Sequence, residues 1–168
     1  LAQNVKKNYD LTIPIKSLKK NLTFVQDNVE HIDFQKKIVK TNHNYDFLIF
    51  SHGAEVNTFQ IPGVEKYTYY LKTFEDSLAI KEKLQELPPS SKIAVIGCGL
   101  AGSELIGTLS DMKKFQIFAI DALERPVITF DKTLSEKVVQ TWEKQNITML
   151  FQSFVQEIKE KSLKIKDK

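Results

Sequence analysis

The stretch KIAVIGCGLAGSEL, residues 92–105, predicts a strand, a tight glycine turn and the start of a helix. Residues 92–97 open with an apolar run rich in β-branched side chains, which is typical of a buried strand. The turn contains Gly97, Gly99 and Gly102 in the spacing G-x-G-x-x-G, and a helix is expected over 100–110. A strand that enters a helix through such a turn indicates the first piece of an α/β sheet.

The residues that follow continue this alternation. We predict one more helix and four more strands, at 115–120 (strand), 132–145 (helix), 147–151, 153–159 and 162–166 (strands). Asp131 is the expected cap of the helix, and Leu134, Val138 and Trp142 form an apolar stripe that should pack on the sheet. Alternating strands and helices imply a parallel sheet with right-handed crossovers.

Each glycine of the turn has a physical role in phosphate binding. Gly97 allows the tight turn, Gly99 lets a pyrophosphate approach the backbone, and Gly102 lets the helix pack closely on the strand. The N–H groups at the start of the helix, at Leu100 and Ala101, then face the phosphates. The fold class is therefore α/β, a Rossmann-like dinucleotide-binding domain with a parallel sheet. The alternative is a phosphate-free scaffold in which the glycines serve packing alone.

Two neighbours of this turn bear on its chemistry. Asp121 ends the strand over 115–120, 19 residues after Gly102, where an acid accepts hydrogen bonds from ribose hydroxyls and repels a 2′-phosphate. NAD(H) is therefore favoured over NADP(H), although Asp121 as a turn or helix cap is the alternative. Cys98 is interpreted as the small residue that the turn requires, with a reactive thiolate as the alternative.

Arg125 is the only arginine in the chain and stands four residues after Asp121. It could contact a 2′-phosphate, but we favour a surface ion pair with Glu124 or another neighbour.

The first part of the chain has a different pattern. Short strand-like runs occur at 22–25, 29–34, 37–40 and 45–50, and the middle two read as a hairpin. IPGV, at 61–64, is a turn signal. We therefore predict two domains, a β-rich segment over 1–62 and a nucleotide-binding domain over 63–168.

A helix joins these parts. Thr73 is its expected N-cap, with Asp76 three residues on as in a capping box. The helix should end before PPSS, at 88–91, because proline removes a backbone donor and disfavours helix in the residue before it.

Composition excludes several function classes. The 168 residues carry 24 basic and 21 acidic side chains, and with one arginine the chain lacks the arginine cluster typical of nucleic-acid readers. The single cysteine excludes an internal disulfide and a dithiol redox pair. His31, His43 and His52 lack metal-ligand spacing, so no metal site and no catalytic residue is predicted.

Three stretches resemble a known family. YDFLIFSHGAEVNTFQIPGVEKYTYYLKTFEDSLAIKEKL (45–84), VIGCGLAGSELIGTLSD and DALERPVITFDKTLSEKV are similar to the type II NADH dehydrogenases of the pyridine nucleotide-disulfide oxidoreductase superfamily. In that family an NADH-binding domain interrupts a flavin domain, and electrons pass from NADH to FAD and then to quinone. The resemblance implies cofactor-binding positions at the pyrophosphate (Gly97, Gly99, Gly102), the adenosine ribose (Asp121), the nicotinamide end (Glu104) and FAD (Gly53).

The departures from the family pattern shape the functional hypotheses. The family's first glycine motif, its later Gly-Asp stretch and its C-terminal membrane-anchoring region have no counterpart here. We therefore expect a chain truncated at both ends, which binds FAD only when the missing segments are supplied and is inactive alone.

Two hypotheses follow. The chain is either the NAD(H)-binding portion of such a flavoprotein, partnered by flavin-domain segments and, in the complete enzyme, by quinone, or a non-catalytic accessory subunit of a respiratory complex. The resemblance implies a peripheral location on the mitochondrial inner membrane or the cytoplasmic face of a bacterial membrane.

Overall fold

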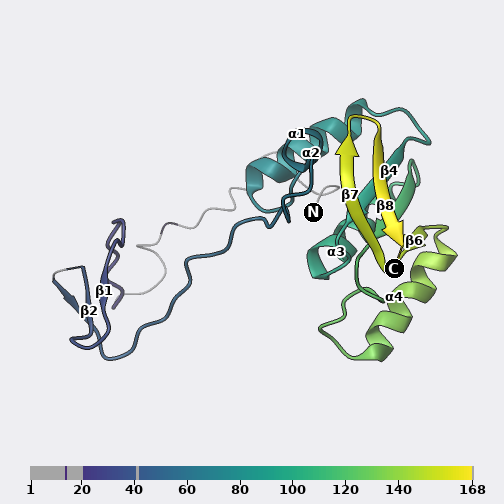
Figure 1. Cartoon of the computed structure of the whole chain (residues 1–168). Coiled ribbons are helices and arrows are strands. Elements are labelled where there is room, and N and C mark those ends of the chain that lie inside the picture. The colour runs from purple at the N-terminus through teal and green to yellow at the C-terminus, as the bar shows by residue number, and fades with distance from the viewer. Residues whose placement is uncertain (1–13, 15–20, 41, 168) are drawn as a thin grey trace. The chain divides into compact units, whose positions relative to one another are not determined.

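The computed structural model describes residues 14, 21–40 and 42–167. Two compact units divide between Glu55 and Val56 (Figure 1). The predicted boundary after residue 62 stays a prediction.

The first unit contains a small antiparallel sheet in the order β1-β2-β3. Its strands are two residues each: β1 (Ile32–Asp33), β2 (Ile38–Val39) and β3 (His43–Asn44). Ile32 pairs with Val39, so the predicted hairpin is confirmed in shorter form. The Asp33 carboxylate stabilises its turn by accepting the backbone N–H groups of Gln35 and Lys36.

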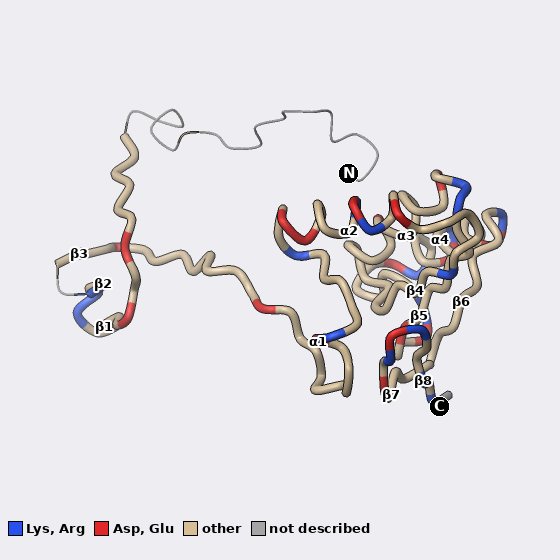
Figure 2. Tube along the Cα trace, turned by 90° about the horizontal axis from the view of Figure 1, so that it is seen from above, with Lys and Arg blue, Asp and Glu red and all other residues tan. Residues whose placement is uncertain are grey.

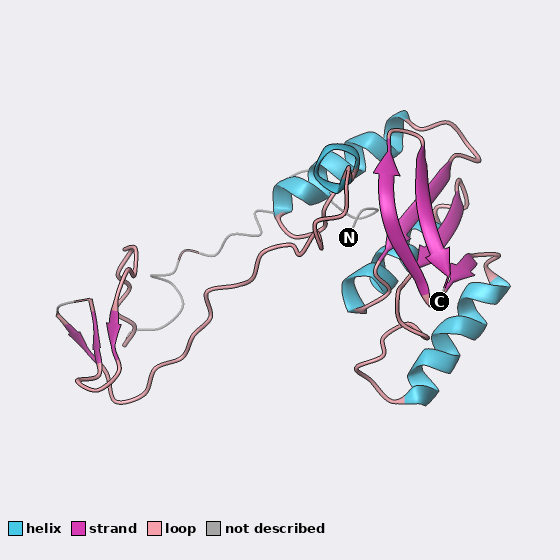
Figure 3. Cartoon of the chain, viewed as in Figure 1, coloured by secondary structure: helices cyan, strands magenta, loops and turns pink. Residues whose placement is uncertain are grey.

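Two predicted strands of this unit are wrong. Residues 22–25 and 45–50 are drawn as loop in Figure 3 and belong to no sheet. Strands over these residues need a neighbouring sheet on which to bury their apolar side chains. Instead, Phe47 is 94% exposed and Ile49 is 87% exposed.

The second unit begins with two helices. The turn predicted at 61–64 is confirmed, because the Val64 N–H donates to the Ile61 carbonyl at 3.2 Å. It leads into α1 (Val64–Tyr67), whose four residues are too few to give a periodic signal. The capping box of α2 (Phe74–Glu86) is also confirmed.

The capping box consists of two reciprocal hydrogen bonds. Asp76 N–H donates to Thr73 Oγ1 at 3.1 Å, and Thr73 N–H donates to Asp76 Oδ2 at 2.8 Å. The bond from the Thr73 N–H is the main reason that the pKa of Asp76 lies below its ordinary value. The helix ends as predicted, with Leu87 in an extended conformation before the two prolines.

A parallel sheet in the order β4-β5-β6 forms the centre of the second unit. Its elements, in chain order, are β4 (Lys92–Ile96), α3 (Leu100–Asp111), β5 (Gln116–Ile120), α4 (Lys132–Lys144) and β6 (Thr148–Leu150). The antiparallel hairpin of β7 (Ser153–Lys159) and β8 (Ser162–Asp167) follows (Figures 1 and 3). The α/β fold class with a parallel sheet is confirmed.

The core of this unit lies between the helices and the sheet. Its buried members are Leu84, Val95, Cys98, Ile106, Leu109, Ile117, Ala119, Trp142 and Ile147. Within the stripe predicted on α4, Trp142 is buried and Val138 packs against this core, but Leu134 is 38% exposed. Ser135 is buried in its place, because its hydroxyl bonds to the loop before α4.

Charge is mixed over the surface of this unit. Both blue and red segments occur along the Cα trace of this unit in Figure 2, so basic and acidic positions are interspersed along the chain.

Candidate functional site

The glycine turn joins β4 to α3 at the carboxyl end of the sheet. Gly97 has φ +92°, a left-handed conformation that side chains disfavour, and its N–H donates to the Ile120 carbonyl at 2.8 Å. A Cβ added at Gly97 or Gly99 would meet nothing within 4 Å. Open space therefore lies beside the backbone at the two positions where a phosphate group would approach it.

Gly102 is required for a different reason. A Cβ at this position would lie 1.9 Å from the Gly97 carbonyl oxygen and 3.0 Å from its carbon. The first turn of α3 therefore packs directly on the backbone of the glycine turn. This contact is the close helix approach that the spacing of the motif predicts.

The first turn of α3 presents backbone donors. The first hydrogen bond there runs from the Ser103 N–H to the Gly99 carbonyl, at 2.9 Å. Helix geometry leaves the earlier N–H groups, those of Leu100, Ala101 and Gly102, without an acceptor inside the helix. Such donors, together with the positive end of the helix dipole, suit an anion. Glu104, two residues after Gly102 on α3, is exposed, and its role at the nicotinamide end stays a prediction.

Asp121 connects the glycine turn to the next loop. Its Oδ2 accepts the Cys98 N–H at 2.6 Å, and its Oδ1 accepts the Leu123 N–H at 2.8 Å. Its backbone N–H donates to Leu150, and its carbonyl accepts from Ser153.

Asp121 is thus held at the carboxyl ends of all three parallel strands, through its carboxylate at Cys98 and through its backbone at Leu150. By bonding to the Leu123 N–H, Asp121 caps the turn that follows it, which was the alternative role predicted from the sequence. By bonding to the Cys98 N–H, it also contacts the glycine turn. A carboxylate oxygen has two lone pairs, so each keeps capacity for a hydroxyl donor.

Cys98 is a structural residue of the turn. Its side chain is 0% exposed, and its Sγ lies 3.7 Å from the Ile120 carbonyl oxygen. Burial, and then the charge of Asp121, raises the pKa of the thiol to about 12. The reactive-thiolate alternative is therefore wrong, since the thiol keeps its proton at neutral pH.

Arg125 is not the surface ion-pair residue that we favoured. Its guanidinium donates to the Ile128 carbonyl at 3.0 Å, to the Phe130 carbonyl at 3.3 Å and to Ser135 Oγ at 2.5 Å. These contacts close the loop between β5 and α4. The loop also reaches the glycine turn, because the Val127 N–H donates to the Cys98 carbonyl at 2.8 Å.

Sequence reasoning did not find this loop contact. The acceptors on the loop are backbone carbonyls, and every residue type supplies one. The one signal in the sequence was the lone arginine, Arg125, four residues after Asp121.

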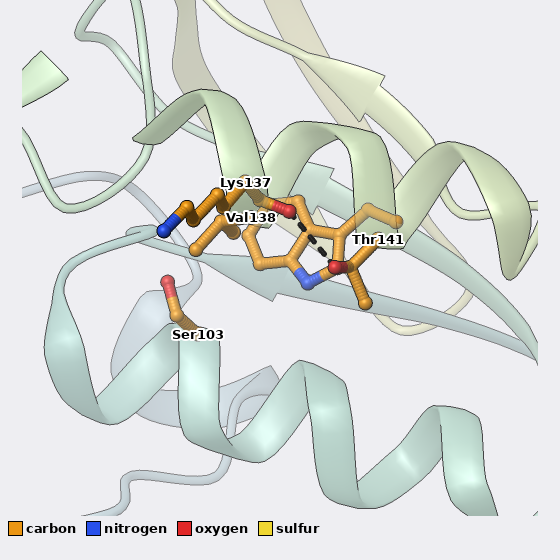
Figure 4. Close-up of a pocket in the computed structure, with 5 residues that line it drawn as sticks. Ser103, Lys137, Val138 and Thr141 are labelled. Atoms are coloured by element: carbon orange, nitrogen blue, oxygen red, sulfur yellow. Dashed lines mark hydrogen bonds between the residues drawn. The ribbon is translucent and has the colours of Figure 1, made fainter. Parts of the chain in front are cut away.

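A hollow of about 200 Å³ lies between α3 and α4. Ser103 faces Lys137 and Val138 across it, with Thr141 and Trp142 completing the wall (Figure 4). The Ser103 hydroxyl donates to the Cys98 carbonyl, and Thr141 Oγ1 donates to the Lys137 carbonyl. Neither Asp121 nor the glycines line this hollow, so we interpret it as a packing seam between the helices.

The remaining residues considered at the sequence level make none of the contacts described above. Gly53 belongs to the first unit, is exposed and has φ +79°, and its FAD role stays a prediction. In the described part of the chain, no three His, Cys, Asp or Glu side chains are grouped to hold a metal ion. Over the same residues, no helix has the length and apolar character needed to span a bilayer.

The site combines an open glycine turn, the donors of a helix start and an acid held beside them. A family model described as pyridine nucleotide-disulphide oxidoreductase matches residues 2–168. The chain belongs to this family. The match covers nearly the whole sequence, including the turn and Asp121.

Individual relatives are similar at moderate identity. The type II NADH:quinone oxidoreductase of Staphylococcus haemolyticus is 28% identical, in a match that covers 83% of this chain and 42% of that protein. The mitochondrial external alternative NAD(P)H-ubiquinone oxidoreductase B2 of Arabidopsis thaliana is also 28% identical, in a match that covers 74% of this chain and 26% of the relative. The chain thus spans less than half the length of these relatives.

A solved structure also matches this chain over part of its own length. The NDH2 of Plasmodium falciparum in complex with NADH matches with a TM-score of 0.62 and 27% identity, over 81% of this chain and 33% of that one.

Proposed function

We propose that this chain is the NAD(H)-binding portion of a type II NADH:quinone oxidoreductase-like flavoprotein. One observation carries the proposal: Asp121 is hydrogen-bonded through Cys98 to a glycine turn that has open space at Gly97 and Gly99. The pyrophosphate would lie against the first N–H groups of α3, and the adenosine ribose would donate to the Asp121 carboxylate. The names of the relatives, and the NADH in the matched Plasmodium structure, support the same cofactor.

The acceptor half of the reaction is proposed from the family resemblance. In the complete enzyme, FAD would supply the redox chemistry between NADH and quinone, at the peripheral membrane location given above. This chain would contribute nucleotide binding and orientation, because hydride transfer depends on how the two rings are held. The flavin would be held by segments of the kind that the longer relatives contain.

A calorimetric titration of NADH into the 168-residue chain tests the proposal. We expect saturable binding, and weaker binding of NADPH. Gly99→Ala is the informative variant: a methyl group fits there without touching the protein, but it occupies the space proposed for the pyrophosphate. We expect this variant to fold normally and to lose NADH binding.

Gly107→Ala is the matched control. It adds the same methyl group to α3, again with nothing within 4 Å, but away from the turn, so NADH binding should be unchanged. Absence of binding by the wild-type chain, or equal binding by Gly99→Ala, would contradict the proposal. The first outcome would favour the accessory-subunit hypothesis instead.

A further inference from the structure

The only arginine of the chain follows Asp121, the proposed ribose contact, by four residues, yet its guanidinium bonds to other groups. Arg125 Nη2 donates to the Ile128 and Phe130 carbonyls at 3.0 and 3.3 Å, and Nη1 donates to Phe130 at 3.3 Å and to Ser135 at 2.5 Å. The Asp121 carboxylate bonds to a different set of groups, the N–H groups of Cys98 and Leu123. The two charged side chains thus bond to different groups: Asp121 to the glycine turn and the start of the loop, and Arg125 to the end of the loop and the first turn of α4.

Ser135 supplies a side-chain acceptor for Arg125, alongside the Ile128 and Phe130 carbonyls. It lies in the first turn of α4 and is 2% exposed. Its hydroxyl accepts from Arg125 and donates to the Pro126 carbonyl at 2.6 Å, so one buried group connects the guanidinium, the loop and the helix. The Pro126 carbonyl has no water to replace this donor, because Pro126 is fully buried.

Arg125 stands at a position in the chain where a free cation would affect which nucleotide binds. A cation just after the acid at the end of the second strand is the kind of group that accommodates the 2′-phosphate of NADP(H). Arginine is suited to this task by its planar fork of donors. Two lysines of α4 stand near this loop in the chain. Lys132 is 78% exposed and pairs with Glu136 on its own helix, and Lys137 lines the hollow beside Ser103, which Asp121 does not line.

We infer that Ser135 is a positioning residue for nucleotide selection. By holding Arg125 on the loop carbonyls, it leaves Asp121 to contact the ribose hydroxyls without a cation at its side, so that NADH is preferred over NADPH. This inference rests on the proposed function. It goes beyond that proposal by assigning selectivity to a buried side chain that touches no nucleotide.

The test compares the dissociation constants of NADH and NADPH for variants of the full chain. Ser135→Ala should release the guanidinium, and the NADPH-to-NADH ratio of dissociation constants should fall by about threefold to tenfold, as expected for a new charge-assisted contact with phosphate. A merely structural loss would weaken both nucleotides equally and leave the ratio unchanged. In the double variant Ser135→Ala/Arg125→Gln no cation is released, so the ratio should stay at the wild-type value.

Further variants keep the inference testable. Thr141→Ala removes a hydroxyl from the same helix, where it donates only to the Lys137 carbonyl, and should leave the ratio unchanged. Should Ser135→Ala fail to fold, Arg125→Lys replaces it: the charge stays but the fork of donors is lost, and the ratio should again fall.

The outcomes separate this inference from the proposed function. A wild-type chain that binds neither nucleotide overturns both. A wild-type chain that prefers NADH, with an unchanged ratio in folded Ser135→Ala and Arg125→Lys, overturns the inference alone. An equal fall of the ratio in Ser135→Ala and in the double variant also overturns it, because Arg125 would then have no part in the effect.

Discussion

Replacing Gly102 with alanine tests the contact that joins α3 to the glycine turn. The added Cβ would lie 1.9 Å from the Gly97 carbonyl oxygen and 3.0 Å from the carbonyl carbon. Ordinary contacts of this kind begin near 3.4 Å, so the helix and the turn must separate by more than an ångström. Both obstacles are backbone atoms, and no side-chain rotation relieves them.

The energy of this change has two opposing contributions. Overpacking of this kind costs about 1–3 kcal/mol, and the higher helix propensity of alanine returns roughly 0.5–1 kcal/mol. The net loss is about 1 kcal/mol at the middle of these ranges, which lowers the midpoint of thermal unfolding by about 2–4 °C for a chain of this size. The displaced turn should also lose NADH binding, because the donors of α3 move with the helix.

Thermal unfolding followed by circular dichroism, together with NADH titration, measures both effects. Gly107→Ala is the control, since it makes the same substitution in the same helix and meets no atom within 4 Å. It should raise stability by roughly 0.5–1 kcal/mol. Equal stabilisation by both alanines would refute the steric reasoning.

Four further predictions concern other parts of the second unit. Asp121→Ala leaves the Cys98 and Leu123 N–H groups without their acceptor. We therefore expect a loss of about 1–3 kcal/mol in the free energy of urea unfolding, and a weaker preference for NADH over NADPH. A variant with unchanged preference would contradict the ribose assignment. Thr73→Ala removes one half of the capping box and should cost about 0.5–2 kcal/mol, whereas equal unfolding curves would show that the box contributes nothing. Native Cys98 should resist an aromatic disulfide reagent at a pH of about 8 until urea is added, and rapid native labelling would contradict its burial. The pKa of the same thiol is 9.0 when unfolded and about 12 when folded. Its contribution to the free energy of unfolding is therefore complete below pH 9.0 and is lost as the pH rises toward 12. Urea unfolding measured over this pH range checks the loss.

The second unit could be predicted from sequence because its signals are local. The Thr73 cap, the two prolines after Leu87 and the glycine turn each determine the conformation of their own residues, so element boundaries there are close to those expected. The first unit could not be predicted as well. An apolar run such as residues 45–50 becomes a strand only when a neighbouring strand pairs with it, and this run belongs to no sheet.

The candidate site was predictable in part for the same reason. The glycines are identified by their spacing, and Asp121 by its distance from them along the chain. The hydrogen bonds that position Asp121 and Arg125 depend on backbone groups of Leu123, Ile128 and Phe130, whose side chains give no signal. The burial of Ser135 was missed because the apolar stripe of α4 predicted Leu134 at the interior instead.

Amide chemical shifts of the isotopically labelled chain, recorded as NADH is added, test the central claim most directly. We predict saturable shifts at the N–H groups of Gly99, Leu100, Ala101 and Gly102, and at Leu123 beside the Asp121 carboxylate, with the first unit unchanged. An unaltered spectrum, or shifts confined to residues outside the glycine turn and the Asp121 loop, would contradict the claim that this turn binds a dinucleotide.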